Sequence, residues 1–142
     1  MNLYSYEEIE IGQKEEFRVE IKEALLDRFR EITGDENPLH RDEIYARQQG
    51  HKGRVAYGML TASFLSTLAG VYLPGERSLI QSVEIKFAKP VYIGDILTVT
   101  GEVTEKNDTY QLIFLKVTIR NQNGEKVLRG KMQIQVLGEE AA

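Results

Sequence analysis

The sequence contains no cysteine among its 142 residues, so it can form neither a disulfide nor a thiolate metal site, and it offers no cysteine nucleophile. The absence of cysteine also fits a reducing cytoplasm, which is the location we expect. Positive charge is in short supply, because 18 lysines and arginines stand against 22 acidic residues, for a net charge of −4. Nucleic-acid binding needs concentrated positive charge, so this balance argues against a nucleic-acid partner.

Long apolar runs are scarce as well. The longest, around residues 59–73, is interrupted by Thr, Ser and Gly, and its length of about 15 residues is less than the roughly 20 that cross a bilayer. The N-terminal residues are acidic and mixed, unlike a signal peptide. We therefore expect no membrane partner and interpret the run as a buried helix. The length of the chain suits a single domain, residues 1–142, with one core.

Hydrophobic periodicity predicts one strand and two helices in the first third of the chain. Apolar and polar residues alternate over 15–21, which is typical of a half-buried strand. Apolar residues then recur at helical spacing over 22–33, and Gly34 follows where a glycine commonly ends a helix. Asn37 followed by proline has the residue types of an N-cap and a first helical residue, so a second short helix is expected over 38–49.

The rest of the chain predicts a sheet and one long helix. The apolar run begins as a helix at Gly58 and is ended by Pro74 and a glycine. Four strands are predicted after it, over residues 82–87, 95–107, 110–122 and 125–137. A tight Asn-Gly hairpin joins the last two. Such a sheet must bury one face, and a helix that is apolar on every side must be covered. We therefore predict an α+β hot-dog fold, a single domain whose antiparallel sheet wraps around a long central helix.

One short segment combines a carboxylate, an Asn-Pro pair and one of only two histidines: TGDENPLH, residues 33–40. Two further segments follow it in order, YGML at 57–60 and FAKPVYIGD at 87–95. In this order and spacing, the three motifs resemble the MaoC-like, (R)-specific enoyl-CoA hydratases, a family with the hot-dog fold. The resemblance extends over roughly residues 29–138.

The resemblance implies a lyase that hydrates a trans-2-enoyl-CoA to an (R)-3-hydroxyacyl-CoA, reversibly, with an acyl-CoA or acyl-carrier-protein thioester as substrate. Asp35 and His40 match the catalytic pair of the family, and Gly58 matches the glycine whose N–H faces the thioester oxygen. Ser66 matches a serine beside the pair. Tyr57 stands where relatives often have histidine, and we expect it in the pocket wall. We expect no cofactor and no metal ion.

These residue types suit that chemistry. On a regular helix, residues five apart diverge by about 140°, so the break after Gly34 is needed to bring Asp35 and His40 into one pocket. A neutral imidazole can take a proton from a water molecule that attacks Cβ, and a carboxylate can hold the same water. Gly58 is expected at a helix start, where an N–H group has no acceptor within the helix. This N–H can therefore bind the thioester oxygen as that oxygen becomes negative.

Other functions remain open. A hot-dog acyl-CoA thioesterase usually has its acid on or near the central helix, yet no Asp or Glu occurs between Gly58 and Leu73. A non-catalytic acyl-thioester-binding module would have no use for a positioned acid–base pair. Taken singly, Asp35 could serve a turn, and Ser66 could bond back to a helical carbonyl.

The predicted oligomer is a homodimer or a dimer of dimers. An isolated sheet of this kind leaves a strand edge unpaired, and the thioester pocket stays open on one side. Pairing of two edges about a two-fold axis closes both.

Overall fold

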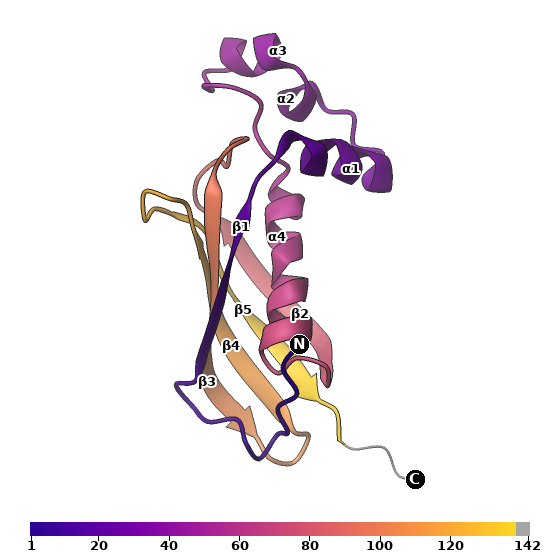
Figure 1. Cartoon of the computed structure of the whole chain (residues 1–142), viewed down its shortest axis with the longest axis vertical. Helices are drawn as coiled ribbons and strands as arrows, with labels where there is room; N and C mark the ends of the chain where they lie inside the picture. Colours follow the sequence, from indigo (N-terminus) through magenta and orange to yellow (C-terminus); the bar gives the residue numbers. More distant parts are fainter. Residues whose placement is uncertain (139–142) are drawn as a thin grey trace.

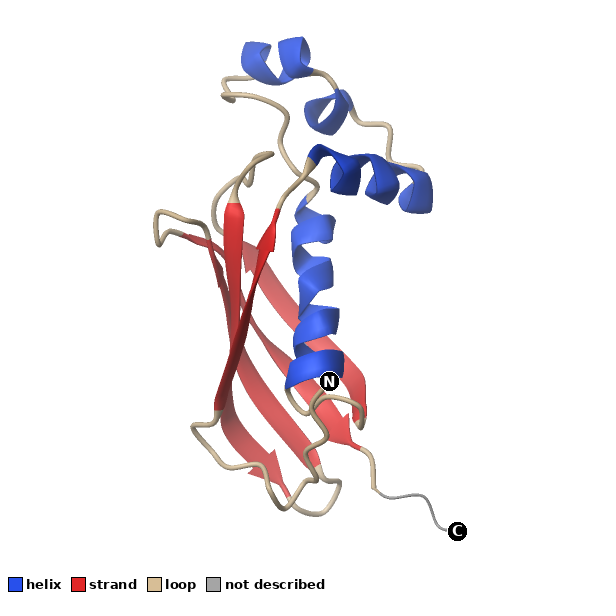
Figure 2. Ribbon diagram, in the orientation of Figure 1, coloured by secondary structure: helices blue, strands red, loops and turns tan. Residues whose placement is uncertain are grey.

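The structure is a computed structural model that describes residues 1–138. Within these residues, a five-stranded antiparallel sheet curves around one helix, and three further helices lie over one end of that helix (Figures 1 and 2). The elements, in chain order, are β1 (Lys14–Glu20), α1 (Glu23–Thr33), α2 (Pro38–Arg41), α3 (Glu43–Gln48), α4 (Gly58–Thr67), η1 (Leu68–Tyr72), β2 (Ser78–Phe87), β3 (Ile96–Asn107), β4 (Leu112–Arg120) and β5 (Lys126–Val136). This is the predicted α+β arrangement with a central helix.

The strands lie in the order β1-β3-β4-β5-β2, and every neighbouring pair is antiparallel. The strands β3, β4 and β5 form an antiparallel meander, and Gly124, with φ of 76°, supplies the left-handed residue of the predicted β4–β5 hairpin. The strand β2 pairs with β5 rather than with β3, which follows it in the chain. It therefore forms one edge of the sheet, and β1 forms the other.

The central helix consists of α4 and a π-helical turn, η1, which Leu73 and Pro74 end. The side chains of Leu65 and Leu68 are almost fully buried beneath the sheet. Gly101 on β3 permits the close approach of η1, because a Cβ there would lie 2.9 Å from Cδ2 of Leu68. No helix in residues 1–138 is both long and apolar enough to span a membrane.

The predicted second helix is wrong in one respect, because it is two helices rather than one. The break falls at Asp42, whose backbone is extended, with φ of −115° and ψ of 110°. Its carboxylate accepts the N–H groups of Ile44 and Tyr45 at 2.9 and 3.1 Å. Aspartate at this position is a favourable N-cap, so Asp42 ends α2 and begins α3 within a single residue.

The expected burial of one whole face of β2 is also wrong. Of the three apolar residues that alternate along this strand, Ile85 packs against the core, whereas Val83 is 43% exposed and Phe87 is 53% exposed. The cause is topological, because β2 lies at the edge of the sheet, where the core covers only part of its face. The apolar face of β2 therefore extends beyond the reach of the central helix.

Candidate active site

The segment after α1 is a chain of local turns that ends in a short helix. Gly34 adopts a left-handed conformation, with φ of 74°, and ends α1. Asp35 Oδ1 accepts the N–H of Asn37 at 3.0 Å, and Asn37 Oδ1 accepts the N–H of Leu39 at 2.9 Å. The predicted N-cap role of Asn37 is thereby confirmed, and its helix α2 carries His40. Among residues 1–138, Oδ2 of Asp35 has no hydrogen-bond partner.

His40 is half-buried and held by the loop that leads to α4. Its Nδ1 lies 2.8 Å from the carbonyl oxygen of Val55. Because a carbonyl can only accept a hydrogen bond, Nδ1 carries the proton and Nε2 carries the lone pair in the neutral ring. Arg54 Nε donates a hydrogen bond to the carbonyl oxygen of His40 at 2.8 Å. The N–H of Val55 donates to the carbonyl oxygen of Leu39. The orientation of the imidazole is therefore fixed from two sides.

Tyr57 links the two members of the predicted dyad. Its ring centroid lies 4.2 Å from that of His40 and 5.0 Å from that of Phe29. Its hydroxyl donates to the backbone oxygen of Asp35 at 2.7 Å. Burial, and next the negative charge of Asp35, raise the pKa of Tyr57 above its ordinary value. The phenol is therefore a protonated donor at neutral pH, and it ties the turn at Asp35 to the start of α4.

A cavity of about 430 Å³ brings these residues together. Its lining includes the N-terminal end of α4, over which α1 and α2 lie (Figure 1). Its lining consists of Phe29, Thr33, Asp35, His40, Tyr57, Gly58, Met59 and Phe87. A second cavity of about 270 Å³ shares His40, Gly58 and Phe87 with the first and continues past Thr61 toward Val91. We call the first the dyad cavity and the second the apolar cavity. The two meet where the backbone of Gly58 lies.

Gly58 is the first residue of α4, so its N–H has no acceptor within the helix. Space beside it is limited, because a Cβ would lie 3.1 Å from Cε1 of Phe87. The absence of a side chain leaves the N-terminal end of the helix open toward both cavities.

The third sequence motif supplies walls rather than reactive groups. Phe87 faces both cavities, and Val91 lines the apolar one. The carbonyl oxygen of Val91 accepts the N–H of Ala56 at 2.7 Å, which joins this segment to the loop before α4. Asp95 ends the motif with a structural role, since its Oδ2 accepts the N–H of Tyr92 at 2.9 Å.

Of the five residues that the sequence singles out, the structure brings four into the dyad cavity and leaves Ser66 outside. Ser66 is exposed on α4, two turns beyond Gly58, and lines neither cavity. Its proposed place beside the pair stays a prediction.

Sequence reasoning missed Thr61, whose hydroxyl is buried without a hydrogen-bond partner among residues 1–138. A threonine in an apolar run carries no signal of its own. Only its burial and its surroundings distinguish it from other residues of the helix.

The second histidine belongs to a separate cluster. His51 Nδ1 lies 3.0 Å from the hydroxyl of Tyr92. Nζ of Lys52 lies over the ring of Tyr92, 4.6 Å from its centroid. Arg54 pairs with Glu23 at 2.8 Å. These contacts fasten the loop before α4. In the described part of the chain, no group of three His, Cys, Asp or Glu side chains is placed to hold a metal ion.

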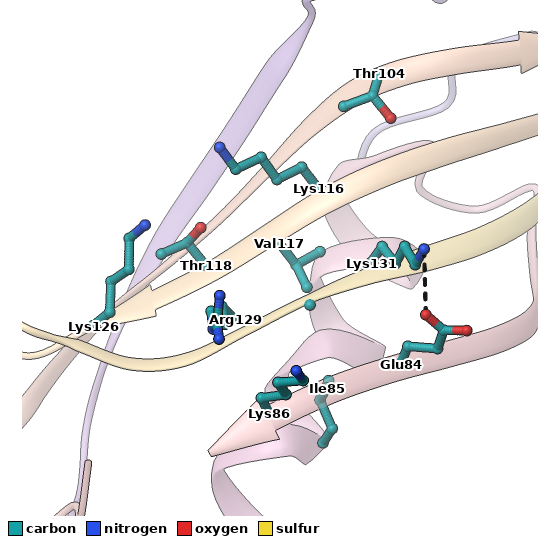
Figure 3. A pocket seen from close by; sticks show the side chains of 11 residues that line it. Glu84, Ile85, Lys86, Thr104, Lys116, Val117, Thr118, Lys126, Arg129 and Lys131 are labelled. Atoms are coloured by element: carbon teal, nitrogen blue, oxygen red, sulfur yellow. Dashed lines mark ion pairs between the residues drawn. The ribbon is translucent and has the colours of Figure 1, made fainter. Parts of the chain in front are cut away.

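A third hollow, of about 570 Å³, is lined by different residues (Figure 3). It lies over β2, β4 and β5 and is lined by the basic residues Lys86, Lys116, Lys126, Arg129 and Lys131. Its carboxylate is that of Glu84, which pairs with Lys131 at 3.4 Å. Lys86 and Lys126 lie at strand ends, whereas Lys116, Arg129 and Lys131 lie within strands, and the hollow contains no residue of the dyad. It offers no acid–base pair near a helix terminus.

The chain belongs to the family of MaoC like domains, which matches residues 7–124. It is 33% identical over 134 residues to the (R)-specific enoyl-CoA hydratase of Rhodospirillum rubrum, over 94% of this chain and 92% of that protein. Identity to the 3-hydroxybutyryl-CoA dehydratase of Methylorubrum extorquens is 39% over 100 residues, which span 70% of this chain and 64% of that protein. The unliganded R-hydratase PhaJ1 of Pseudomonas aeruginosa superposes with a TM-score of 0.90 at 34% identity, over 97% of this chain and 91% of that one.

The predicted family and the hot-dog fold are thus confirmed. The relatives are named as hydratases and dehydratases, which are lyases, so the predicted enzyme class is confirmed as well.

Proposed function

We propose that the protein hydrates trans-2-enoyl-CoA to (R)-3-hydroxyacyl-CoA, reversibly, with a water molecule that Asp35 and His40 activate. The observation that carries this proposal is the convergence of a carboxylate, an imidazole with a free lone pair and the start of α4 at Gly58 on one cavity. The similarity to (R)-specific enoyl-CoA hydratases supports the substrate class.

The hydrogen bond from Nδ1 of His40 to Val55 leaves Nε2 as the acceptor for the proton of the attacking water. The water oxygen bonds to Cβ, and the electron pair of the double bond moves through Cα to the thioester oxygen. The N–H of Gly58 is the donor that stabilises this oxygen. Asp35 uses Oδ2 to hold the same water, and the acid–base pair returns a proton to Cα. The reverse sequence is the dehydration.

The carrier of the acyl group is coenzyme A in this proposal, and an acyl carrier protein supports the same chemistry. A mitochondrial 3-hydroxyacyl-[acyl-carrier-protein] dehydratase of Arabidopsis thaliana is 33% identical over 106 residues. The two carriers can be distinguished by comparing the hydration rates of crotonyl-CoA and of crotonyl-loaded acyl carrier protein at equal concentration.

Incubation with crotonyl-CoA tests the reaction itself. We expect loss of the enoyl absorbance without release of free thiol, and chiral chromatography of the hydrolysed product should give the (R)-3-hydroxy acid. Release of thiol would instead identify a thioesterase. If neither signal changes, the chain is a non-catalytic thioester-binding module or takes another substrate class, and the proposal fails.

Replacement of Tyr57 tests its bridging position. Tyr57→Phe keeps the ring against His40 but loses the hydrogen bond to Asp35, so we expect a fall in kcat of about three- to tenfold, the scale of one net hydrogen bond. Tyr57→Ala also enlarges the dyad cavity and should alter the preference between crotonyl-CoA and 2-octenoyl-CoA, whereas Tyr57→His should be tolerated. Tyr92→Phe, which loses a hydroxyl contact with His51 away from both cavities, is the matched control. An unchanged specificity profile in all Tyr57 variants would place this residue outside the functional pocket.

The exposed apolar edge supports a second copy of the chain as partner, in a homodimer or a dimer of dimers. Leu79, Val83 and Phe87 on β2 are 50%, 43% and 53% exposed, and Met59 on α4 is 62% exposed. Because β2 also has unpaired backbone groups along its outer side, edge-to-edge pairing would cover both. A partner laid across α4 would cover Ser66 as well.

Light scattering at micromolar concentration should give at least twice the mass of one 16.2 kDa chain. Val83→Lys should shift the protein toward the monomer, because it places a charge in the proposed interface. Ser82→Lys, on the opposite face of the strand, is the control. A monomeric wild-type protein would contradict this assembly.

A further inference from the structure

The hydroxyl of Thr61 stands out because it is buried and unsatisfied. Thr61 is 2% exposed, and its Oγ1 has no hydrogen-bond partner within residues 1–138. A helical threonine usually donates to the carbonyl four residues before it. Here the carbonyl of Tyr57 accepts the N–H groups of Leu60 and Thr61 at 3.0 and 3.2 Å but receives no bond from the Thr61 hydroxyl. Buried polar groups are rarely left unpaired, so an unpaired one beside a cavity points to a ligand atom.

The place of Thr61 indicates which ligand atom this is. Thr61 follows Gly58 by three residues, close to one helical turn, and both line the apolar cavity together with His40. Side chains on a helix lean toward its N-terminus, so the Thr61 side chain lies over the turn that begins at Gly58. Glycine has no side chain to separate the hydroxyl from the free end of the helix.

The remainder of the apolar cavity offers few competing polar side chains. Its lining includes Val55, Ala56, Phe87, Ala88, Pro90, Val91 and Val127. Lys89, the charged residue of this lining, is paired with Glu125. A bound thioester would therefore meet the imidazole of His40, the N–H of Gly58 and the hydroxyl of Thr61 as its principal polar contacts.

We propose that the hydroxyl of Thr61 is a second hydrogen-bond donor to the thioester oxygen, beside the N–H of Gly58. This inference rests on the proposed hydration of enoyl thioesters. When water adds to Cβ, the electron pair of the double bond moves to that oxygen, which then accepts hydrogen bonds from both donors. Since the hydroxyl has no partner within residues 1–138, it gives up no protein hydrogen bond when it donates to that oxygen.

The test compares two replacements with opposite chemistry. Thr61→Val keeps the shape and loses the donor, whereas Thr61→Ser keeps the donor. We expect Thr61→Val to lower kcat at least about tenfold, with KM nearly unchanged. This lower bound is below the loss of about 10²- to 10³-fold known for a removed oxyanion donor, because the N–H of Gly58 remains. The factor should be the same for crotonyl-, 2-hexenoyl- and 2-octenoyl-CoA. Thr61→Ser should stay within about threefold of wild type. Ser63→Ala on the same helix, whose hydroxyl bonds to the carbonyl of Leu60, is the matched control.

Two further measurements separate a donor from a structural residue. Because the hydroxyl has no partner in the protein, Thr61→Val should not lower Tm. Infrared spectroscopy of bound 3-hydroxybutyryl-CoA labelled with ¹³C at the thioester carbonyl should show a higher stretching frequency in Thr61→Val than in wild type, since one hydrogen bond to that oxygen is lost.

Each possible outcome bears on the inference. Equal kcat in Thr61→Val and wild type overturns it, as does an unchanged carbonyl frequency. A loss that depends on chain length would place Thr61 against the acyl tail instead. If the wild-type protein hydrates no enoyl thioester, the proposed function fails and this inference falls with it. If wild type and Thr61→Val hydrate crotonyl-CoA equally, the inference fails while the proposed function stands.

Discussion

Asp35→Asn and His40→Gln should each reduce the hydration of crotonyl-CoA by about 10²- to 10⁴-fold, the usual contribution of a general acid–base group. Both replacements keep the local structure. The amide oxygen of asparagine can still accept the N–H of Asn37, and the amide N–H of glutamine can still donate to Val55. What is lost is the carboxylate charge in one case and the basic Nε2 in the other. KM should change little, because substrate affinity rests on the acyl chain and its carrier.

Steady-state kinetics of the single and double variants provide the measurement. Since the two groups act on one water molecule, the double variant should be scarcely slower than the poorer single variant. Two variants are matched controls: Asp42→Asn, near the dyad in the chain, keeps the N-cap of α3, and His51→Gln replaces the other histidine of the chain. Both controls should stay close to wild-type activity. If the Asp35 and His40 variants also stay within a few-fold of wild type, the dyad is only a helix break.

The elements that are visible in the sequence are those fixed by neighbouring residues. The left-handed Gly34 ends α1 as its position predicts, and the cap at Asn37 places His40 on a new helix. The turn at Gly124 likewise joins two strands in the expected way. In each case a residue of special backbone geometry acts within about four positions of itself, so a local pattern is enough.

The features that the sequence hides depend on partners distant in the chain. No local pattern states that β2 pairs with β5 and lies at the edge of the sheet, where Phe87 is 53% exposed. The contact of Tyr57 with the turn at Asp35 joins residues 22 apart. Thr61 has an ordinary residue type for an apolar helix, and its importance follows only from the lack of a partner around it. Sequence motifs thus predict the candidate reactive residues, whereas the contacts that support them required the fold.

Gly58→Val should cost at least about 2 kcal/mol of transition-state stabilisation, which is roughly a thirtyfold loss in kcat/KM and the scale of one lost oxyanion donor. The structure gives a steric reason. A Cβ at this position would lie 3.1 and 3.3 Å from Cε1 and Cζ of Phe87, so the ring that lines both cavities must move, and two further methyl groups would enter the space beside His40. Gly58→Ala adds the Cβ alone and should give an intermediate loss.

The control for these variants is Gly70→Ala, on the same long helix, where a Cβ would make an ordinary contact of 3.7 Å with Oγ of Ser78. That change should leave both the rate and Tm close to wild type. Loss of a glycine at the helix start should not unfold the protein, because alanine and valine are better helix formers than glycine. The rate and Tm of Gly58→Val therefore test whether Gly58 has a catalytic role. A folded variant with a near-normal rate would mean that the N–H of Gly58 does not bind the thioester oxygen. A folded variant with a low rate would instead tie the chemistry to this end of α4.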